Sequence, residues 1–165
     1  MATVQVEIRM AAFDPWQELS VWGGHAAASA VFIGRVRATA MDGRVLQALE
    51  LEHYPGLCER LLEAMAERLR QTHAAERVLV LHRVGRLSPG EPIVLVAVEA
   101  DHRGPAQRCA ADLLEELKHR APFWKREWCG DQGVWLNSNT SLWASDSRAR
   151  GCLLYTSDAA DDSYR

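Results

Sequence analysis

The segment that most constrains the fold is an uninterrupted apolar run in the middle of the chain, residues 93–98, with the sequence IVLVAV, inside a predicted strand over residues 93–100. A run of this kind, without polar alternation, is typical of a strand that is buried on both faces. It is far too short to cross a membrane as a helix, which needs ~20 apolar residues. The run therefore predicts a fully buried strand and no membrane-spanning segment.

The composition indicates one ordinary globular domain. The 165 residues are 48% hydrophobic and 25% charged, which leaves room for one core. The N-terminus has no basic segment followed by an apolar run, so the expected compartment is the cytoplasm. The formal net charge of -3 gives no global attraction to nucleic acid, so any anion site must be local.

The hydrophobic patterns mix strands and helices without strict alternation, which predicts an α+β fold with two main helices. A turn at residues 41–43 favours a long hairpin between two of the strands, 28–37 and 45–53. The predicted strands are 4–8, 28–37, 45–53, 78–82, 93–100, 123–128 and 134–136. The predicted helices are a short one capped by Asp14 and two amphipathic ones over 57–73 and 105–119.

The C-terminal segment is set apart from the domain. Residues 145–151 are rich in Ser, Arg and Gly, which places the end of the domain at residue 151. Residues 152–165, CLLYTSDAADDSYR, resemble an in-frame translation of a transposon-type sequencing adapter. We interpret them as an unstructured, adapter-derived artefact; a disordered acidic tail is the other interpretation.

The chain uses lysine very sparingly. It holds 17 arginines but only two lysines, Lys118 and Lys125, which flank Pro122. A lysine amine that is desolvated or placed beside other cations can lose its proton and act as a base or nucleophile, whereas arginine cannot. A chemical requirement for lysine at these positions is one interpretation, and coincidence in an arginine-rich chain is the other.

Other cations could join these lysines. If the end of the strand 28–37 meets the second main helix, several positive groups converge on one patch, which would suit a phosphate or carboxylate and would lower a lysine pKa. The alternative is that these groups are solvated cations on helix flanks. The candidates are His102, Arg103, Arg120, Arg126, Arg35 and Arg37.

Motifs of several familiar enzyme classes are absent from the sequence. It contains no Walker loop, no G-x-S-x-G elbow and no H-E-x-x-H, so the common hydrolases and nucleoside triphosphatases lose support. Its four cysteines, Cys58, Cys109, Cys129 and Cys152, form no C-x-x-C pair and are expected to be free thiols. No metal site and no cofactor are predicted. His53 and His82 end predicted strands and are expected to be hydrogen-bonded histidines of the core or edge.

Five segments, in this order, resemble the large, catalytic subunit of molybdopterin synthase: FIGRVR at 32–37, LEHYPG at 51–56, HRVG at 82–85, HR at 102–103 and LKHRAPFWKRE at 117–127. Each is weak alone, but in this order and spacing they are specific, and the resemblance extends over residues 28–136, about two thirds of the chain. The resemblance implies an α/β hammerhead fold. It also implies sulfur transfer to cyclic pyranopterin monophosphate, also called precursor Z, in the synthesis of the molybdenum cofactor.

The resemblance also implies partners and residue roles. The sulfur would arrive as the C-terminal glycine thiocarboxylate of a small ubiquitin-like subunit, in a heterotetramer built on a dimer of large subunits. By motif, Lys118 and Lys125 are the expected catalytic residues. The expected substrate-binding residues are Arg35, Val36, Arg37, His102, Arg103, Arg126 and Glu127.

A second function remains open at this point. A non-catalytic module could use the same cationic pocket to bind the C-terminal carboxylate of a carrier protein. The retention of both lysines favours the enzyme, because a pure anion clamp would work with arginine at either place.

Overall fold

The computed structural model describes residues 3–136, and these form three helices and eight strands. In chain order they are β1 (Val4–Arg9), α1 (Pro15–Trp22), β2 (Ala28–Arg35), β3 (Ala48–Glu52), α2 (Leu57–Thr72), β4 (Arg77–Arg83), β5 (Gly85–Leu87), β6 (Pro92–Ala100), α3 (Arg103–Arg120), β7 (Trp124–Cys129) and β8 (Gln132–Leu136). The α+β class and the two long helices predicted from the sequence are confirmed.

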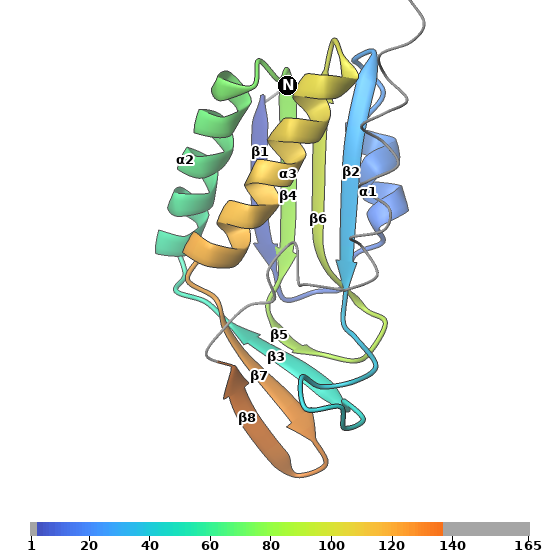
Figure 1. Ribbon diagram of the computed structural model, residues 1–165, viewed down its shortest axis with the longest axis vertical. Helices are drawn as coiled ribbons and strands as arrows, with labels where there is room; N and C mark the ends of the chain where they lie inside the picture. The colour runs from blue at the N-terminus through green and yellow to red at the C-terminus, as the bar shows by residue number, and fades with distance from the viewer. Residues whose placement is uncertain (1–2, 137–165) are drawn as a thin grey trace, which may run out of the picture.

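The first sheet is mixed and has the strand order β1-β4-β6-β2 (Figure 1). β1 pairs with β4 in parallel, while the β4–β6 and β2–β6 pairs are antiparallel. Helices α2 and α3 cover one face of this sheet, and α1 lies on the other.

The central strand β6 is buried on both faces, as its apolar run predicts. Val96 and Val98 point into the core beneath α2 and α3, where they meet Leu62 and Leu113. Alternate residues of the strand point the other way, where Leu95 packs in a second cluster with residues of α1. This two-sided burial follows from the alternation of side chains along a strand.

The short helix α1 begins where its capping residue predicts. The Asp14 carboxylate accepts a hydrogen bond from the backbone N–H of Trp16 at 2.9 Å, and Pro15 occupies the first helical turn. Both features are typical of a helix N-terminus. The cap places Trp22, at the end of α1, against the first sheet.

The second sheet is antiparallel, has the order β5-β3-β7-β8 and lies below the first in Figure 1. The predicted hairpin between residues 28–37 and 45–53 is wrong. β2 pairs with β6 of the first sheet, whereas β3 pairs with β5 and β7 of the second. The turn signal at 41–43 closes only one local bridge, between Thr39 and Val45, because the apolar side chains of the two strands belong to different cores.

Two sequence predictions concern residues that the structure does not describe. The domain end at residue 151 and the tail 152–165, which includes Cys152, lie outside them. Within residues 3–136, Cys58, Cys109 and Cys129 are free thiols, as expected. No helix among these residues is long and apolar enough to cross a membrane.

Candidate active site

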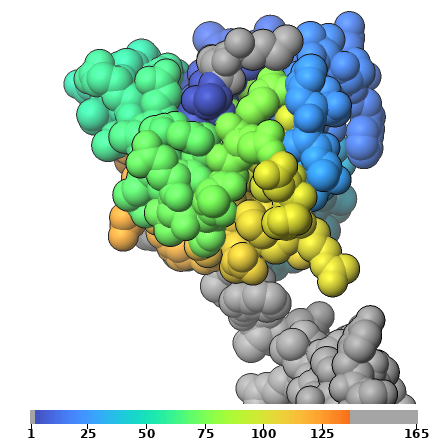
Figure 2. Space-filling model, turned by 90° about the horizontal axis from the view of Figure 1, so that it is seen from above, coloured from blue at the N-terminus to red at the C-terminus, as the bar shows by residue number. Residues whose placement is uncertain are grey.

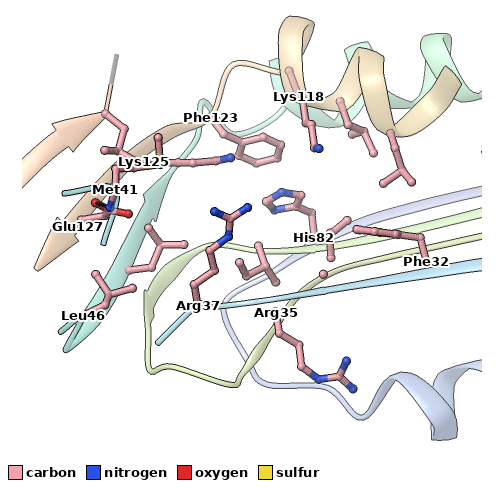
Figure 3. A pocket seen from close by; sticks show the side chains of 18 residues that line it. Phe32, Arg35, Arg37, Met41, Leu46, His82, Lys118, Phe123, Lys125 and Glu127 are labelled. Atoms are coloured by element: carbon pink, nitrogen blue, oxygen red, sulfur yellow. Dashed lines mark hydrogen bonds between the residues drawn. The ribbon is translucent and has the colours of Figure 1, made fainter. Parts of the chain in front are cut away.

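A pocket of about 240 Å³ lies where the two sheets meet. It is bounded by the end of β2, the last turns of α3 and the start of β7 (Figure 3). Its walls are largely apolar and include Phe32, Leu46, Leu114 and Leu117. The ionisable side chains that line it are Arg35, Arg37, His82, Lys118, Lys125 and Glu127.

The end of α3 brings both lysines to this pocket. Lys118 lies in the last turn of the helix, one residue after the buried Leu117. The chain leaves the helix at Ala121, passes Pro122 and enters β7, where Lys125 pairs with Leu51 of β3. This sharp exit places both amines against one cavity, as Figure 3 shows.

Strand alternation decides which residues of β7 reach the pocket. Lys125 and Glu127 share one face of the strand, and both line the cavity. Glu127 also fixes the loop above it, because its carboxylate accepts a hydrogen bond from the Met41 N–H at 3.0 Å. Arg126 points to the opposite face, where its guanidinium stacks on the rings of Trp128 and Trp135 at 4.9 and 4.2 Å.

The segment after β2 supplies one arginine to the pocket centre. The guanidinium of Arg37 points toward the space near Lys125, whereas that of Arg35 points away from both lysines (Figure 3). Val36, between them, is buried in the core of the second sheet, and its N–H donates to the carbonyl of Glu91 at 3.0 Å. This anchor fixes the backbone next to Arg37, whose side chain lines the pocket.

The pocket lowers the pKa of Lys125. Burial lowers the pKa of Lys125, and the positive charges of Lys118 and Arg37 lower it further. Burial disfavours the charged amine, and like charges repel it, so both effects act in the same direction. The surroundings of Lys125 therefore make its amine easier to deprotonate than an ordinary lysine amine. A proton-transfer group or nucleophile requires this.

The same perturbation predicts a gain in stability when the charge is removed. A lysine whose pKa is lower in the folded than in the unfolded state destabilises the fold while it is charged, and this cost fades as the pH rises through the lowered pKa. We expect Lys125→Met to raise the free energy of unfolding at neutral pH by ~1 kcal/mol, with a smaller gain at alkaline pH.

Urea unfolding at several pH values measures this difference. The matched control is Arg108→Met, which removes an exposed cation from α3 and should change stability little. An equal gain in both variants, or a gain for Lys125→Met that grows with pH, would contradict the prediction.

The cysteines do not supply the chemistry of the pocket. Cys58 and Cys109 lie in the core between the helices and the first sheet, and burial raises the pKa of each thiol to about 11. Such thiols are poor nucleophiles at neutral pH. None of the three described cysteines lines the cavity. Within residues 3–136, no group of three or more His, Cys, Asp or Glu side chains could hold a metal ion.

A model of the MoaE protein family matches residues 8–120, which is more than half of the chain. The chain belongs to the MoaE family. The resemblance read from the five segments is confirmed. The match includes β2, α2 and the whole of α3, and with them Lys118 on α3 and Arg37 just after β2.

Relatives of this MoaE-family chain match more than two thirds of it. The molybdopterin synthase catalytic subunit of Pseudomonas aeruginosa is 39% identical over 146 residues, which are 87% of this chain and 97% of that protein. The protein of the same name from Cereibacter sphaeroides is 46% identical over 115 residues, or 68% of this chain and 77% of that one.

Solved structures have the same fold. The MoaE protein of Burkholderia ambifaria is 35% identical, with a TM-score of 0.67 over 83% of this chain and 93% of that one. Molybdopterin synthase of Staphylococcus aureus is 26% identical, with a TM-score of 0.71 over 82% of this chain and 98% of that one. The fold class expected from the resemblance is therefore confirmed.

The structure brings together only part of the predicted site of this MoaE-family protein. Arg35, Arg37, Lys118, Lys125 and Glu127 line one pocket. Two other predicted residues are close in sequence but do not line it: Val36 is core, and Arg126 lies on the far face of β7. The prediction that these two residues line the pocket is therefore wrong. Val36 is buried in the core of the second sheet, and strand alternation turns Arg126 to the opposite face of β7.

His102 and Arg103 lie at the other end of α3. The helix has 18 residues, so about 25 Å separates its two ends. Both residues are exposed, and Figure 2 looks onto this end of the molecule, where the yellow start of α3 is at the surface. Within one chain they cannot reach the pocket that holds Lys118.

One residue of the pocket could not be placed from the sequence. His82 is a buried, hydrogen-bonded histidine, as expected, but it also lines the pocket. Its ring stacks on Phe123 with centroids 3.9 Å apart. The signal in the sequence was weak: a histidine at the end of a buried strand, far in sequence from either lysine.

Proposed function

We propose that this protein is the catalytic subunit of a molybdopterin synthase. In this proposal it transfers sulfur from the C-terminal glycine thiocarboxylate of a small ubiquitin-like subunit to cyclic pyranopterin monophosphate. The observation that carries the proposal is the convergence of the chain's only two lysines, with Arg37, on one pocket. The family and its named relatives supply the reaction.

The cations of the pocket suit both reactants. The pterin substrate carries a phosphate, and the partner's tail ends in a thiocarboxylate, so each brings an anion. Arg37 and Lys118 can bind such groups, and the apolar walls exclude water and strengthen the attraction. Binding both anions side by side would bring the sulfur to the pterin.

Proton transfer falls to the lysines. The thiocarboxylate sulfur attacks the pterin side chain, and an oxygen leaves as the C–S bond forms. Water then hydrolyses the resulting thioester, which leaves the sulfur on the pterin and returns the partner's C-terminus as a carboxylate. Protons must be taken up and released at each of these steps. Lys125 suits this role because its surroundings lower its pKa, and Lys118 lies in the same pocket. The sulfur comes with the partner, so the reaction needs no cysteine of this chain.

The separation of His102 and Arg103 from the lysines bears on the assembly. If these two residues bind the substrate, as their motif predicts, they must do so in the pocket of a second copy of the chain. This supports a homodimer of large subunits, with a small subunit at each of the two pockets. The exposed position of both residues is compatible with such a contact.

Mixing two inactive variants tests this arrangement. Lys118→Ala and Arg103→Ala should each be nearly inactive, but a dimer of one chain of each variant contains one intact pocket. Random mixing after dissociation should then restore about a quarter of the wild-type turnover, because half of the dimers are mixed and each has one working site. Turnover that stays at the level of the separate variants would contradict a shared site.

Reconstitution distinguishes the enzyme from a binding module. The chain is mixed with the pterin substrate and with the small subunit, supplied as the thiocarboxylate or as the carboxylate. The enzyme should form dithiolene product with the thiocarboxylate only, although both forms bind. Tight binding of the thiocarboxylated partner without conversion would favour the non-catalytic module.

A further inference from the structure

The pocket contains many hydrogen-bond donors but few acceptors. Arginine and lysine side chains only donate when charged, so Arg37, Lys118 and Lys125 can hold anions but cannot accept a hydrogen bond from a substrate N–H. Among the described side chains that line the pocket, only Glu127 and His82 carry oxygen or nitrogen acceptor atoms. The Glu127 carboxylate already accepts the Met41 N–H.

The hydrogen bonds of His82 fix the tautomer of its ring. Its Nδ1 lies 2.8 Å from the carbonyl oxygen of Arg83. A carbonyl oxygen can only accept, so Nδ1 carries the proton and Nε2 keeps an unshared electron pair. This bond joins neighbouring residues of one strand end, so the ring orientation does not depend on a mobile side chain.

Aromatic contact holds the ring from one side. The imidazole stacks on Phe123, with an angle of 10° between the ring planes, and Phe123 also lies 6.4 Å from the ring of His53. The ring is therefore held by two contacts: the hydrogen bond to the Arg83 carbonyl at the end of β4, and the stack on Phe123 in the turn before β7. Figure 3 shows it facing the same space as Lys118, Lys125 and Arg37.

The ring also stays neutral. Burial lowers the pKa of His82 to about 4, the hydrogen bond to Arg83 offsets this in part, and the nearby Lys125 and His53 lower the pKa further. At neutral pH, His82 is therefore an uncharged acceptor in a pocket of cations.

We propose that His82 is a substrate-positioning residue whose Nε2 accepts a hydrogen bond from an N–H group of the pterin ring while the cations of the pocket hold the phosphate. The inference rests on the proposed function and extends it to a residue that is not among the expected substrate-binding residues. It gives the pocket a way to orient the neutral end of a substrate whose other end is anionic. A phosphate without the ring would not use this contact.

Binding without turnover tests the proposal. The full chain, in complex with the small subunit in its carboxylate form, is titrated with cyclic pyranopterin monophosphate by calorimetry. His82→Asn places an amide donor near the position of Nδ1 and leaves the position of Nε2 empty. We expect its dissociation constant for the pterin to rise about tenfold, which is the usual effect of one lost hydrogen bond.

Two further variants separate the acceptor from the ring. His82→Gln can place an amide oxygen near the position of Nε2, so it should bind the pterin more tightly than His82→Asn. His82→Phe keeps the stack on Phe123 without either nitrogen and should bind as weakly as His82→Asn. The affinity for the small subunit should be unchanged in all three variants.

Three results would overturn the proposal. Wild-type affinity for the pterin in His82→Asn would show that the acceptor has no role. Equal weakening in all three variants, with a lower affinity for the small subunit as well, would show a structural role only. Absence of pterin binding by the wild-type complex would overturn the proposed function too, and this outcome is distinguishable because it does not depend on His82.

Discussion

Lys118→Ala is expected to lower the turnover of the reconstituted enzyme by about 10³-fold, the range that loss of a positioned acid–base group produces. The side chain lies at the C-terminal end of α3 and projects into the pocket, while the neighbouring Leu117 holds the helix in the core. Truncation therefore removes the amine without removing the residue that anchors it. The thermal unfolding of the variant should match that of the wild type within a few degrees.

Lys118→Arg is the matched control for charge. Arginine retains the positive charge but does not release a proton at neutral pH. If Lys118 transfers a proton, the arginine variant should bind substrate and partner normally and still turn over slowly. Near-normal turnover of Lys118→Arg would assign the residue to anion binding, and undiminished turnover of Lys118→Ala would contradict its catalytic role.

Glu99→Ala should destabilise the fold by about 3–5 kcal/mol, the range expected when one partner of a buried ion pair is removed. Glu99 is fully buried on β6, and its carboxylate lies 3.2 Å from Nη1 of Arg77. It also accepts the backbone N–H groups of Gly24 at 2.6 Å and His25 at 3.2 Å. The single carboxylate thus ties the loop after α1 to the central strand.

In Glu99→Ala, the guanidinium of Arg77 and the N–H groups of Gly24 and His25 lose the carboxylate that accepts their hydrogen bonds. Arg77 would retain its hydrogen bond to the Trp22 carbonyl at 2.7 Å, but its charge would lose the carboxylate. Glu99→Gln keeps an oxygen for the loop N–H groups and should cost less, about 1–2 kcal/mol. Equilibrium unfolding in urea measures both variants, and an alanine variant as stable as the glutamine variant would contradict this role.

The helices and the central strand could be predicted from local pattern alone. The leucine spacing of α2 and α3 and the apolar composition of β6 are direct consequences of what those elements contact. Strand pairing could not be predicted in the same way. The turn at residues 41–43 is a local signal, whereas the partner of β2 is set by β6, which lies about sixty residues further along the chain.

The three-residue strand β5 could not be predicted from the sequence for a related reason. It begins at Gly85, whose positive φ of 90° lets the chain turn sharply after β4. Its pairing with β3 fixes it as a strand, and a segment this short carries no periodic pattern. Tertiary context alone therefore defines it.

The site was predictable in part. The rarity of lysine singled out Lys118 and Lys125, and the helix break at Pro122 explains how both reach one pocket. The sequence could not show that α3 holds Arg103 far from Lys118, or that the pleat of β7 turns Arg126 away from the pocket. Nor could it show that the end of β4 directs His82 toward the lysines.

Sulfur stoichiometry tests the proposed reaction most directly. In a single reaction of the chain, thiocarboxylated small subunit and cyclic pyranopterin monophosphate, mass spectrometry follows the pterin and the intact small subunit together. We expect the pterin to gain two sulfurs while two small subunits per pterin return to the carboxylate, and we expect neither change with Lys118→Ala. Conversion of the small subunit without sulfur in the pterin, or sulfur transfer that continues in the variant, would contradict a sulfurtransferase at this pocket.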